Sequence, residues 1–575
     1  MKKSNLLFLL LLLMMACQDK SVDPKESWTP ETSPFRPNIV WLVAEDLSHY
    51  IPPFGDSTIQ TPHLSRLAEE GVRYTNLFSV AGVCSPSRAA LCTGMYPSSV
   101  GAQNMRTQYN AELLAQVGLI PYEVVLPPAV KMMSQVMREN GYYATNNDKT
   151  DYQFVPSTTA WDDNGPVAHW RNRPAGKPFF SIFNFNVTHE SQVFGTTSKK
   201  ALRFKEGFPQ DLSKEPKPDW TGGLDSADWT LAVPEDLAVK VPPYLVEDEG
   251  TIADIRRVYS NIAIMDQQVG FLVKQLEEDG LLDSTIIVWY TDHGGPLPRQ
   301  KRLLYDSGLR VPMIIRYPEK WNAGAIDNQL ISFVDFAPTT FSMASIAPPA
   351  YLQGQAVIGP YKQKTRSYIH AAADRLDSEI DMIRAVSDGR YKYLRNFQPN
   401  RGYYLAVEYR ERMNSMKSLL KGRDAGTLNE YQAQWFRPNK APEELFDTQN
   451  DPHELNNLAT DPAYAEKLAE LRTECDRWMA AISDKGHIPE AEMLENFWPN
   501  RVQPITATPV ISNEGNKVSL SCPTDGANLG YKIIVNGKEP PAWTPYTEPF
   551  EGPKAGELKV IAHRIGFKPS EVMVE

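Results

Sequence analysis

The stretch NIVWLVAED, residues 38–46, decides the fold. Its six successive apolar residues, without polar alternation, are typical of a strand that is buried on both faces of a sheet. Similar runs recur in KPFFSIFNFNV (177–187) and STIIVWYTD (284–292). Amphipathic helical patterns lie in residues 61–71, 129–145 and 255–282. We therefore predict an α/β fold in which helices flank a mostly parallel sheet.

Composition limits the class of protein. The chain has 575 residues, a formal net charge of -11 and an isoelectric point near 5.5. Hydrophobic residues make up 42% and charged residues 22%, which is typical of a soluble globular protein and not of a disordered chain. The length predicts at least two domains, and the acidic balance argues against nucleic acid as a partner.

Three folded units are predicted. Residues 35–384 carry the alternation of strands and helices and are predicted to form one large α/β domain. Residues 385–500 contain a strand pair around Asp388 and Gly389 and a long helix near 461–482, which indicates a smaller α+β subdomain. Residues 504–575 have short alternating runs broken by Gly, Pro and Asn, which indicates a β-sandwich accessory module.

The N-terminus has the features of an export signal. Two lysines precede a short apolar run, residues 6–16, and Cys17 follows directly. The run is too short to span a bilayer, and a cysteine after a small residue resembles a bacterial lipoprotein signal. We predict a signal peptide over residues 1–17, a tether over 18–34, and a lipid-anchored protein in the periplasm or at the outer cell surface. Ordinary signal cleavage nearby is the alternative.

Four cysteines remain after Cys17, too few for a disulfide framework in a chain of this length. Cys92 and Cys475 lie in apolar, helix-like contexts and are predicted to be buried thiols. Cys84 is followed by Ser-Pro-Ser-Arg, a pattern that predicts a helix N-terminus, where free backbone N–H groups favour anions. A small buried residue at a tight junction between strand and helix is an equally good interpretation of Cys84 alone.

Acidic and imidazole side chains follow the ends of the predicted strands. Glu45 and Asp46 end the first run, His189 follows the second, and Asp292 and His293 end the third. Because the carboxyl ends of parallel strands meet at one edge, these groups can converge on a divalent cation. Taken alone, acidic residues after a strand more often cap the next turn or helix, and a lone histidine is more often a hydrogen-bonding residue than a ligand.

The stretch CSPSRAALCTG, residues 84–94, resembles the signature C-x-P-S-R-x-x-L-x-T-G of the formylglycine-dependent sulfatases, which belong to the alkaline-phosphatase-like superfamily. The resemblance continues over about residues 36–485. It includes the stretches 38–47, 61–76, 290–295, 301–318 and 444–462.

The resemblance implies a set of site residues. Cys84 would be oxidised to formylglycine by a separate maturase, and the hydrated aldehyde would attack sulfur and later release sulfate as the aldehyde re-forms. Arg88 would hold the hydrate, Lys149 and Lys301 would neutralise the sulfate, and His189 would act as general acid. The implied metal ligands are Glu45, Asp46, Asp292 and His293.

Three positions depart from the family pattern. Glu45 stands where Asp is usual, His293 where Asn is commoner, and Asp151 where a histidine is usual. Ca²⁺ is the expected ion. Because imidazole is a softer ligand than an amide, Mn²⁺ or Zn²⁺ stays open as an alternative. Without the missing histidine, His189 supplies the proton alone, or Asp151 substitutes for it.

The substrate expectation is a sulfated polysaccharide or oligosaccharide, because the stretches 149–154 and 292–302 resemble the heparan-sulfamidase-like branch. Exposed charged residues in loops above the site could contact sugars. The predicted contacts are Arg106, Asp151, His370, Asp374, Arg375 and Asp377. Two alternatives stay open: a phosphonate or phosphodiester hydrolase of the same superfamily, and an inactive glycan-binding lipoprotein.

Overall fold

The computed structural model describes residues 36–194 and 232–575. Its central sheet has the strand order β4-β3-β5-β1-β6-β7-β2-β8, with β9 paired to β2. These strands are β1 (Asn38–Ala44), β2 (Val72–Phe78), β3 (Tyr143–Asn147), β4 (Asp163–Asn164), β5 (Phe179–Phe185), β6 (Thr285–Thr291), β7 (Arg310–Arg316), β8 (Ile326–Asp327) and β9 (Ile331–Ser332). Strands β4, β3, β5, β1 and β6 run parallel, whereas β7 is antiparallel to both neighbours. The predicted α/β class with a mostly parallel sheet is confirmed.

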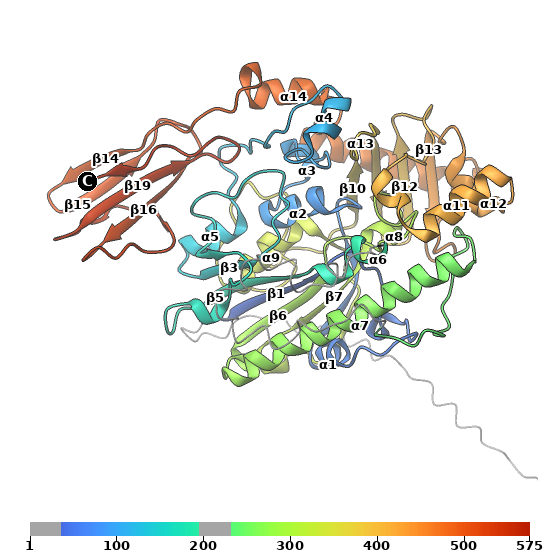
Figure 1. The fold of residues 1–575 in the computed structure, drawn as a ribbon, viewed down its shortest axis with the longest axis horizontal. Helices are drawn as coiled ribbons and strands as arrows, with labels where there is room; N and C mark the ends of the chain where they lie inside the picture. The colour runs from blue at the N-terminus through green and yellow to red at the C-terminus, as the bar shows by residue number, and fades with distance from the viewer. Residues whose placement is uncertain (1–35, 195–231) are drawn as a thin grey trace, which may run out of the picture.

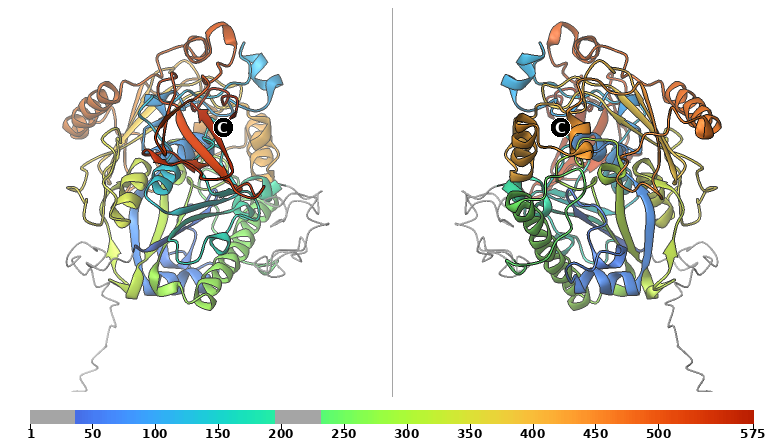
Figure 2. Two further views of the ribbon diagram at one scale, coloured as in Figure 1. Left: turned by 90° about the vertical axis from the view of Figure 1, so that its left-hand side faces the viewer. Right: turned by 90° about the vertical axis from the view of Figure 1, so that its right-hand side faces the viewer.

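Strand β1 lies in the middle of the sheet, and its alternate side chains enter two different cores. One set is Ile39, Trp41 and Val43, and the other is Val40, Leu42 and Ala44. Side chains of α2 (Cys84–Thr93), α5 (Met133–Glu139) and α9 (Phe336–Met343) join the first core, and those of α1 (Pro62–Glu70) and α7 (Glu249–Glu278) join the second. Figures 1 and 2 show these helices on the two faces of the sheet. Burial on both faces explains why the first run has no polar alternation.

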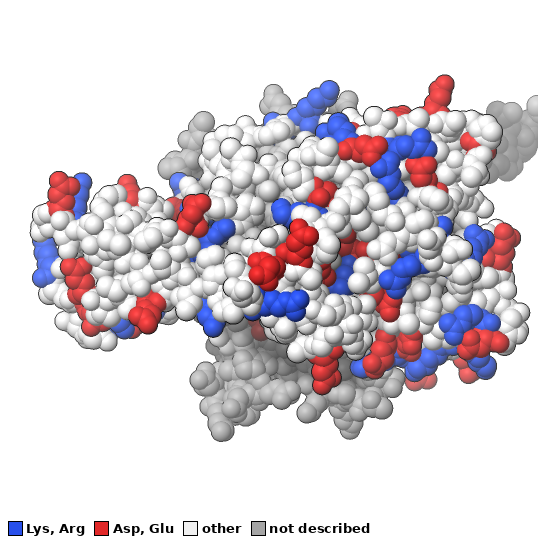
Figure 3. All heavy atoms as spheres, turned by 90° about the horizontal axis from the view of Figure 1, so that it is seen from above, with Lys and Arg blue, Asp and Glu red and all other residues white. Residues whose placement is uncertain are grey.

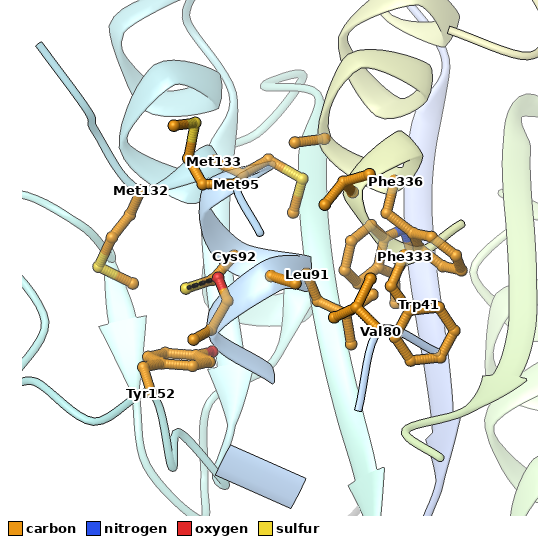
Figure 4. Close-up of a cluster of buried hydrophobic side chains, with 14 of the residues drawn as sticks. Trp41, Val80, Leu91, Cys92, Met95, Met132, Met133, Tyr152, Phe333 and Phe336 are labelled. Carbon is orange, nitrogen blue, oxygen red and sulfur yellow. Dashed lines mark hydrogen bonds between the residues drawn. The ribbon is translucent and has the colours of Figure 1, made fainter. Parts of the chain in front are cut away.

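Helix α2 is anchored in the first core. Figure 4 shows Leu91 and Cys92 of this helix among buried apolar side chains that include Trp41 and Phe336. The Cys92 thiol donates to the backbone carbonyl of Ala89 at 3.4 Å. Cys92 and Cys475 are free and buried, as predicted. The dense packing holds the helix, and with it Cys84 at its first position, in a fixed place.

A second, antiparallel sheet consists of β10 (Ile369–Ala373), β11 (Ile383–Ser387), β12 (Tyr391–Asn396) and β13 (Glu443–Asp447). The predicted turn at Gly389, with φ of 94°, joins β11 to β12, and α13 (Ala465–Ile482) packs on this sheet as the predicted long helix. The predicted boundary between residues 384 and 385 falls inside β11. Because β10 pairs with β11, the second sheet extends back to Ile369. The other predicted limits stay predictions.

The C-terminal region consists of two small antiparallel sheets that share one apolar core. Their strands are β14 (Val510–Glu514), β15 (Lys517–Ser521), β16 (Asn528–Ile534), β17 (Thr544–Pro545), β18 (Phe550–Glu551), β19 (Glu557–His563) and β20 (Met573–Val574). This β-sandwich projects as a lobe (Figures 1 and 3). It is docked on α5, where the Gln135 amide donates to Asn528 at 2.7 Å and Arg138 donates to the Trp543 carbonyl at 2.8 Å. On the face in Figure 3, acidic and basic side chains are interspersed.

The remaining helices are α3 (Pro97–Val100), α4 (Ala111–Gln116), α6 (Ser191–Phe194), α8 (Asp306–Leu309), α10 (Glu408–Glu411), α11 (Asn414–Ala425), α12 (Glu430–Ala433) and α14 (Glu490–Phe497). Within residues 36–194 and 232–575, no helix combines the length and apolar composition that crossing a membrane requires. The predicted signal peptide, Cys17 and the tether lie outside the described residues.

Candidate active site

The site lies at the carboxyl edge of the parallel strands. Glu45 and Asp46 follow β1, and Asp292 and His293 follow β6, its parallel neighbour. Asp46 adopts a left-handed backbone with φ of 48°, and its N–H donates to Oδ1 of Asp292 at 3.2 Å. The Glu45 N–H donates to the hydroxyl of Thr188, beyond β5, at 2.9 Å. Three strand ends are thereby tied together, as the sequence predicted.

Cys84 is the first residue of α2, and its thiol faces this cluster. Sγ lies 3.2 Å from Nε2 of His293 and 4.0 Å from Oδ1 of Asp46. The preceding residue, Val83, is extended, so the chain turns sharply into the helix at Cys84. The helix start therefore directs residue 84 and the positive end of the helix dipole toward the carboxylates.

The cluster fits a divalent cation. One ligand atom each from Asp46, Cys84, Asp292 and His293 lie within 4.8 Å of one another, and all four residues are buried. Nδ1 of His293 lies 3.0 Å from the carbonyl of Gly294 and donates to it, so Nε2 is the nitrogen that faces the cluster and would bind a cation after losing its own proton. Carboxylate oxygens with one imidazole nitrogen form a donor set that suits hard or borderline cations.

Glu45 supplies a second observation in favour of a cation. Its side chain is fully buried, and Oε1 has no hydrogen-bond partner within the described chain. Burial raises the pKa of Glu45, although Lys149 and Arg88 act in the opposite direction. A cation bound near Glu45 and Asp46 would compensate a carboxylate that the protein leaves incompletely neutralised.

The charges of Asp46, Asp292 and His293 depend on one another. Burial opposes ionisation of Asp46, but Lys301 and His293 outweigh it and hold its pKa well below the usual range. The pKa of Asp292 is also lowered, because His293 and Arg88 outweigh burial. Burial opposes the charged form of His293, yet Asp292 and Asp46 raise its pKa to about 10. Asp46 and Asp292 are therefore anionic and available to a cation.

Three predicted cationic groups surround the carboxylates. Arg88 donates from Nε to Asp292 at 3.0 Å and from Nη1 to Asn184 at 2.7 Å. Lys149 pairs with Glu45. Lys301, which is 2% exposed, lies 2.6 Å from Asp46 Oδ2. The structure thus brings Cys84, Arg88, Lys149 and Lys301 to one place.

His189 borders the same cluster. One of its ring nitrogens lies within 4.8 Å of ligand atoms of Glu45, Asp46 and Cys84. Burial lowers the pKa of His189 to about 3, with further lowering by Lys301. The imidazole is therefore neutral near neutral pH. Asp151, which replaces the family histidine, accepts a hydrogen bond from the Ser85 hydroxyl at 2.5 Å.

Four further residues support the site, although no sequence pattern marked them. Glu190 pairs with Arg302 through two contacts of 2.7 and 2.9 Å, lies 3.1 Å from Lys301, and donates its backbone N–H to Asp46 at 2.7 Å. The others are Arg302, Thr188 and Asn184. The available signal was adjacency, because Thr188 and Glu190 flank His189 and Arg302 follows Lys301.

Of the predicted sugar contacts, Arg106 and Asp377 form an ion pair with 2.5 Å between Arg106 Nε and Asp377 Oδ1. The Arg106 side chain is 31% exposed. It lies over the ring of Tyr409. The Arg106 side chain is therefore partly accessible at the surface, whereas Asp377 is buried.

The expected exposure is wrong for four of the six predicted contacts: Asp377, His370, Asp374 and Arg375. His370 is bonded to Glu474 at 2.8 Å and stacks on Trp478. Asp374 pairs with Arg384 at 3.0 Å, and Arg375 pairs with Glu490 at 2.6 Å. These residues are buried, because β11, α13 and α14 supply the side chains that pair with β10 and the residues after it.

Comparisons with known proteins identify the family. Residues 37–346 match the family model described as Sulfatase, and residues 299–425 match the one described as N-sulphoglucosamine sulphohydrolase, C-terminal. An ulvan-active sulfatase of Formosa agariphila is 50% identical, over 99% of this chain and 97% of the relative. The human N-sulphoglucosamine sulphohydrolase is 24% identical, over 81% of this chain and 95% of the relative.

A solved structure described as a 2-O GAG sulfatase matches the fold with a TM-score of 0.54 and 20% identity, over 78% of this chain and 93% of that chain. The predicted resemblance to the sulfamidase-like branch and the predicted alkaline-phosphatase-like fold are confirmed. The chain belongs to the sulfatase family.

Proposed function

We propose that the chain hydrolyses sulfate esters of a sulfated polysaccharide of the ulvan type. The observation that carries the proposal is the convergence of Cys84 Sγ with Asp46 and His293 at distances of 4.0 and 3.2 Å. The substrate class is supported by the relative that is 50% identical over nearly the whole chain and is named for its action on ulvan.

Cys84 is proposed to be the precursor of formylglycine, formed by a separate maturase. The hydrated aldehyde would supply the nucleophile for sulfur and a route to release sulfate. Arg88 is held in place by Asp292 and Asn184, so it can orient residue 84. Lys149 and Lys301 provide positive charge for the sulfate oxygens, and His189 donates a hydrogen bond to the leaving oxygen.

Glu45, Asp46, Asp292 and His293 are proposed to hold a divalent cation, with Ca²⁺ favoured by the carboxylates and Mn²⁺ or Zn²⁺ by the imidazole. The ion would act as a Lewis acid toward a sulfate oxygen. Within the described residues, Oε1 of Glu45 accepts no hydrogen bond and lies 3.8 Å from Arg88 Nη2, which leaves it able to bind a cation and supports the assignment.

The localisation proposal rests on the sequence of the first 17 residues. Export and lipid modification at Cys17 would anchor the enzyme in the periplasm or at the outer cell surface. Replacing Cys17 with Ala should move the protein from the membrane fraction to the soluble exported fraction. Retention of the variant in the membrane fraction would contradict the anchor.

The test of function is sulfate release from ulvan oligosaccharides by protein in which the aldehyde at residue 84 has been verified by mass spectrometry. Heparan-type oligosaccharides and an aryl phosphodiester serve as comparison substrates. We expect fastest turnover on ulvan oligosaccharides. Faster phosphodiester cleavage would favour the phosphodiesterase alternative, and glycan binding without turnover by an unmodified thiol would favour the binding protein.

A further inference from the structure

Glu190 connects two cationic side chains at the edge of the active site. Its carboxylate accepts two hydrogen bonds from the Arg302 guanidinium, at 2.7 and 2.9 Å, and Oε1 also lies 3.1 Å from Nζ of Lys301. The three side chains are only 1% to 3% exposed. A two-point pair with a guanidinium keeps a buried carboxylate anionic. Glu190 is therefore a fixed negative charge beside the lysine that is proposed to bind sulfate.

The backbone of Glu190 orients Asp46. Its N–H donates to Oδ2 of Asp46 at 2.7 Å, and Nζ of Lys301 donates to the same oxygen at 2.6 Å. The other oxygen, Oδ1, lies 3.0 Å from Nε2 of His293 and 4.0 Å from Sγ of Cys84. Glu190 and Lys301 thus hold one oxygen of Asp46, and the second oxygen faces residue 84.

The segment that carries Lys301 is bent and anchored. Arg302 has a left-handed backbone with φ of 76°, which is uncommon for a residue other than glycine, and its N–H donates to the carbonyl of Gly82 at 2.6 Å. A Cβ atom at Gly82 would lie 2.4 Å from the carbonyl oxygen of Leu303, so the two segments are in close contact. Because Gly82 lies just before Cys84, Arg302 connects the start of α2 to Glu190, which lies beyond β5.

Each cationic side chain of the cluster is paired with a carboxylate. The pairs are Arg88 with Asp292 at 3.0 Å, Lys149 with Glu45, Lys301 with Asp46 at 2.6 Å, and Arg302 with Glu190 at 2.7 Å. Three of these carboxylates are proposed cation ligands. Glu190 contributes none of the candidate ligand atoms that converge near Cys84 among the described residues. Its charge therefore acts on Lys301 and opposes an anion that binds there.

We propose that Glu190 is a positioning residue that holds Lys301 for the sulfate group and, through its charge, limits how tightly the sulfate product is bound. The ammonium group of Lys301 has three N–H donors. Asp46 and Glu190 each lie within reach of one, and the third can bind a sulfate oxygen. Because free sulfate carries two negative charges, a carboxylate nearby favours its departure. The proposal rests on the proposed sulfatase function and extends it to the release of sulfate.

The direction of the change in sulfate affinity tests the charge. Inorganic sulfate is titrated calorimetrically, at constant ionic strength, into the full-length, metal-loaded protein with the verified aldehyde. Glu190→Gln removes a negative charge and should tighten binding about tenfold, whereas Arg302→Gln removes a positive charge and should weaken it about tenfold. Both variants break the same ion pair, so a purely structural pair would shift both affinities in one direction. Such a common shift would overturn the proposal.

Steady-state kinetics test the positioning of Lys301. In Glu190→Gln, kcat on ulvan oligosaccharides should fall about fivefold, because Lys301 loses a partner and sulfate leaves more slowly. KM should fall about threefold, because the sulfate group of the substrate also binds more tightly. A loss of folded protein alone would lower kcat and leave KM unchanged. An unchanged or raised KM would contradict the role of the charge.

A double variant, Glu190→Gln with Arg302→Gln, separates the two effects. Removing both charges of a buried pair costs less stability than removing one, so this variant keeps the test decisive if a single variant does not fold. Its sulfate affinity should lie within about threefold of the parent value, and its kcat should stay about fivefold lower because Lys301 still lacks the carboxylate. A tenfold change in affinity would overturn the role of the charge, and a parental kcat would overturn the positioning of Lys301.

The matched control is Glu490→Gln. Glu490, in α14, forms a similar two-point pair with Arg375, at 2.6 and 2.7 Å. Its variant should change sulfate affinity less than about twofold, because a charge outside the cluster is screened. A tenfold tightening in this control would overturn the assignment to Glu190.

The same measurements distinguish this proposal from the proposed function. Absence of sulfate release by the parent protein with the verified aldehyde would count against the proposed function. In an active parent protein, sulfate affinities in the wrong order among the variants would overturn only the role of Glu190.

Discussion

Nε2 of His293 lies 3.2 Å from Sγ of Cys84, while Nδ1 of the same ring faces the carbonyl of Gly294 at 3.0 Å. The second contact fixes the ring and keeps Nε2 toward the residue proposed to become the nucleophile. The same nitrogen is 3.0 Å from Oδ1 of Asp46, so one imidazole connects the helix start to the carboxylates of two strands. Asp46, Asp292 and His293 would hold the cation, which would supply Lewis-acid chemistry near residue 84.

His293→Asn should change the metal preference. An amide oxygen is a harder ligand than an imidazole nitrogen, so the variant should favour Ca²⁺ more strongly than the parent protein does. After removal of bound metal by a chelator, sulfatase activity is measured as Ca²⁺, Mn²⁺ or Zn²⁺ is returned. Identical rescue profiles for parent and variant would exclude His293 as a ligand.

His189→Ala should reduce kcat on ulvan oligosaccharides by about a hundredfold, because the leaving sugar oxygen loses its hydrogen-bond donor. An activated aryl sulfate has a good leaving group and should lose less than about threefold. Steady-state kinetics on both substrates measure the difference. Equal losses would remove the role of His189 at the leaving oxygen.

Lys301→Met should destabilise the metal-free protein by about 3 kcal/mol, because Asp46 and Glu190 remain buried and lose a shared cation. Urea denaturation in the presence of a chelator gives the change in free energy of unfolding. The control is Lys274→Met, which breaks an exposed pair with Glu278 and should cost less than about 0.5 kcal/mol. Similar values for the two variants would contradict the buried network.

His189 should also make stability depend on pH. Its folded-state pKa is about 3, below the ordinary value of 6.5. Between these values the unfolded chain binds a proton at His189 and the folded chain does not, so stability falls as the pH falls from 6.5. Relative to His189→Gln, the parent protein should lose about 1.4 kcal/mol per pH unit in this range. Urea midpoints of both proteins at several pH values test this, and parallel curves would contradict it.

The strand ends were predictable because a parallel sheet places the carboxyl ends of its strands at one edge. Glu45, Asp46, Asp292 and His293 directly follow buried runs, so a local pattern was enough to find them. Cys84 could be identified as a functional residue only with the help of the motif, because its position at a helix start is equally typical of a buried structural residue.

The partners of charged residues could not be predicted in the same way. Glu190 pairs with Arg302 across 112 positions, and Arg375 pairs with Glu490 across 115. Whether a charged residue is exposed depends on such distant partners, which no local pattern contains. In the same way, β10 belongs to the second sheet only through its pairing with β11.

The central claim is that residue 84 becomes the catalytic aldehyde of a sulfatase. The most direct measurement determines the mass of the peptide that contains residue 84 and the rate of sulfate release from ulvan oligosaccharides in the same preparations, with different fractions modified. The rate should rise in proportion to the aldehyde fraction and be absent in Cys84→Ala. Sulfate release that is independent of the aldehyde fraction, or that survives in Cys84→Ala, would contradict the claim.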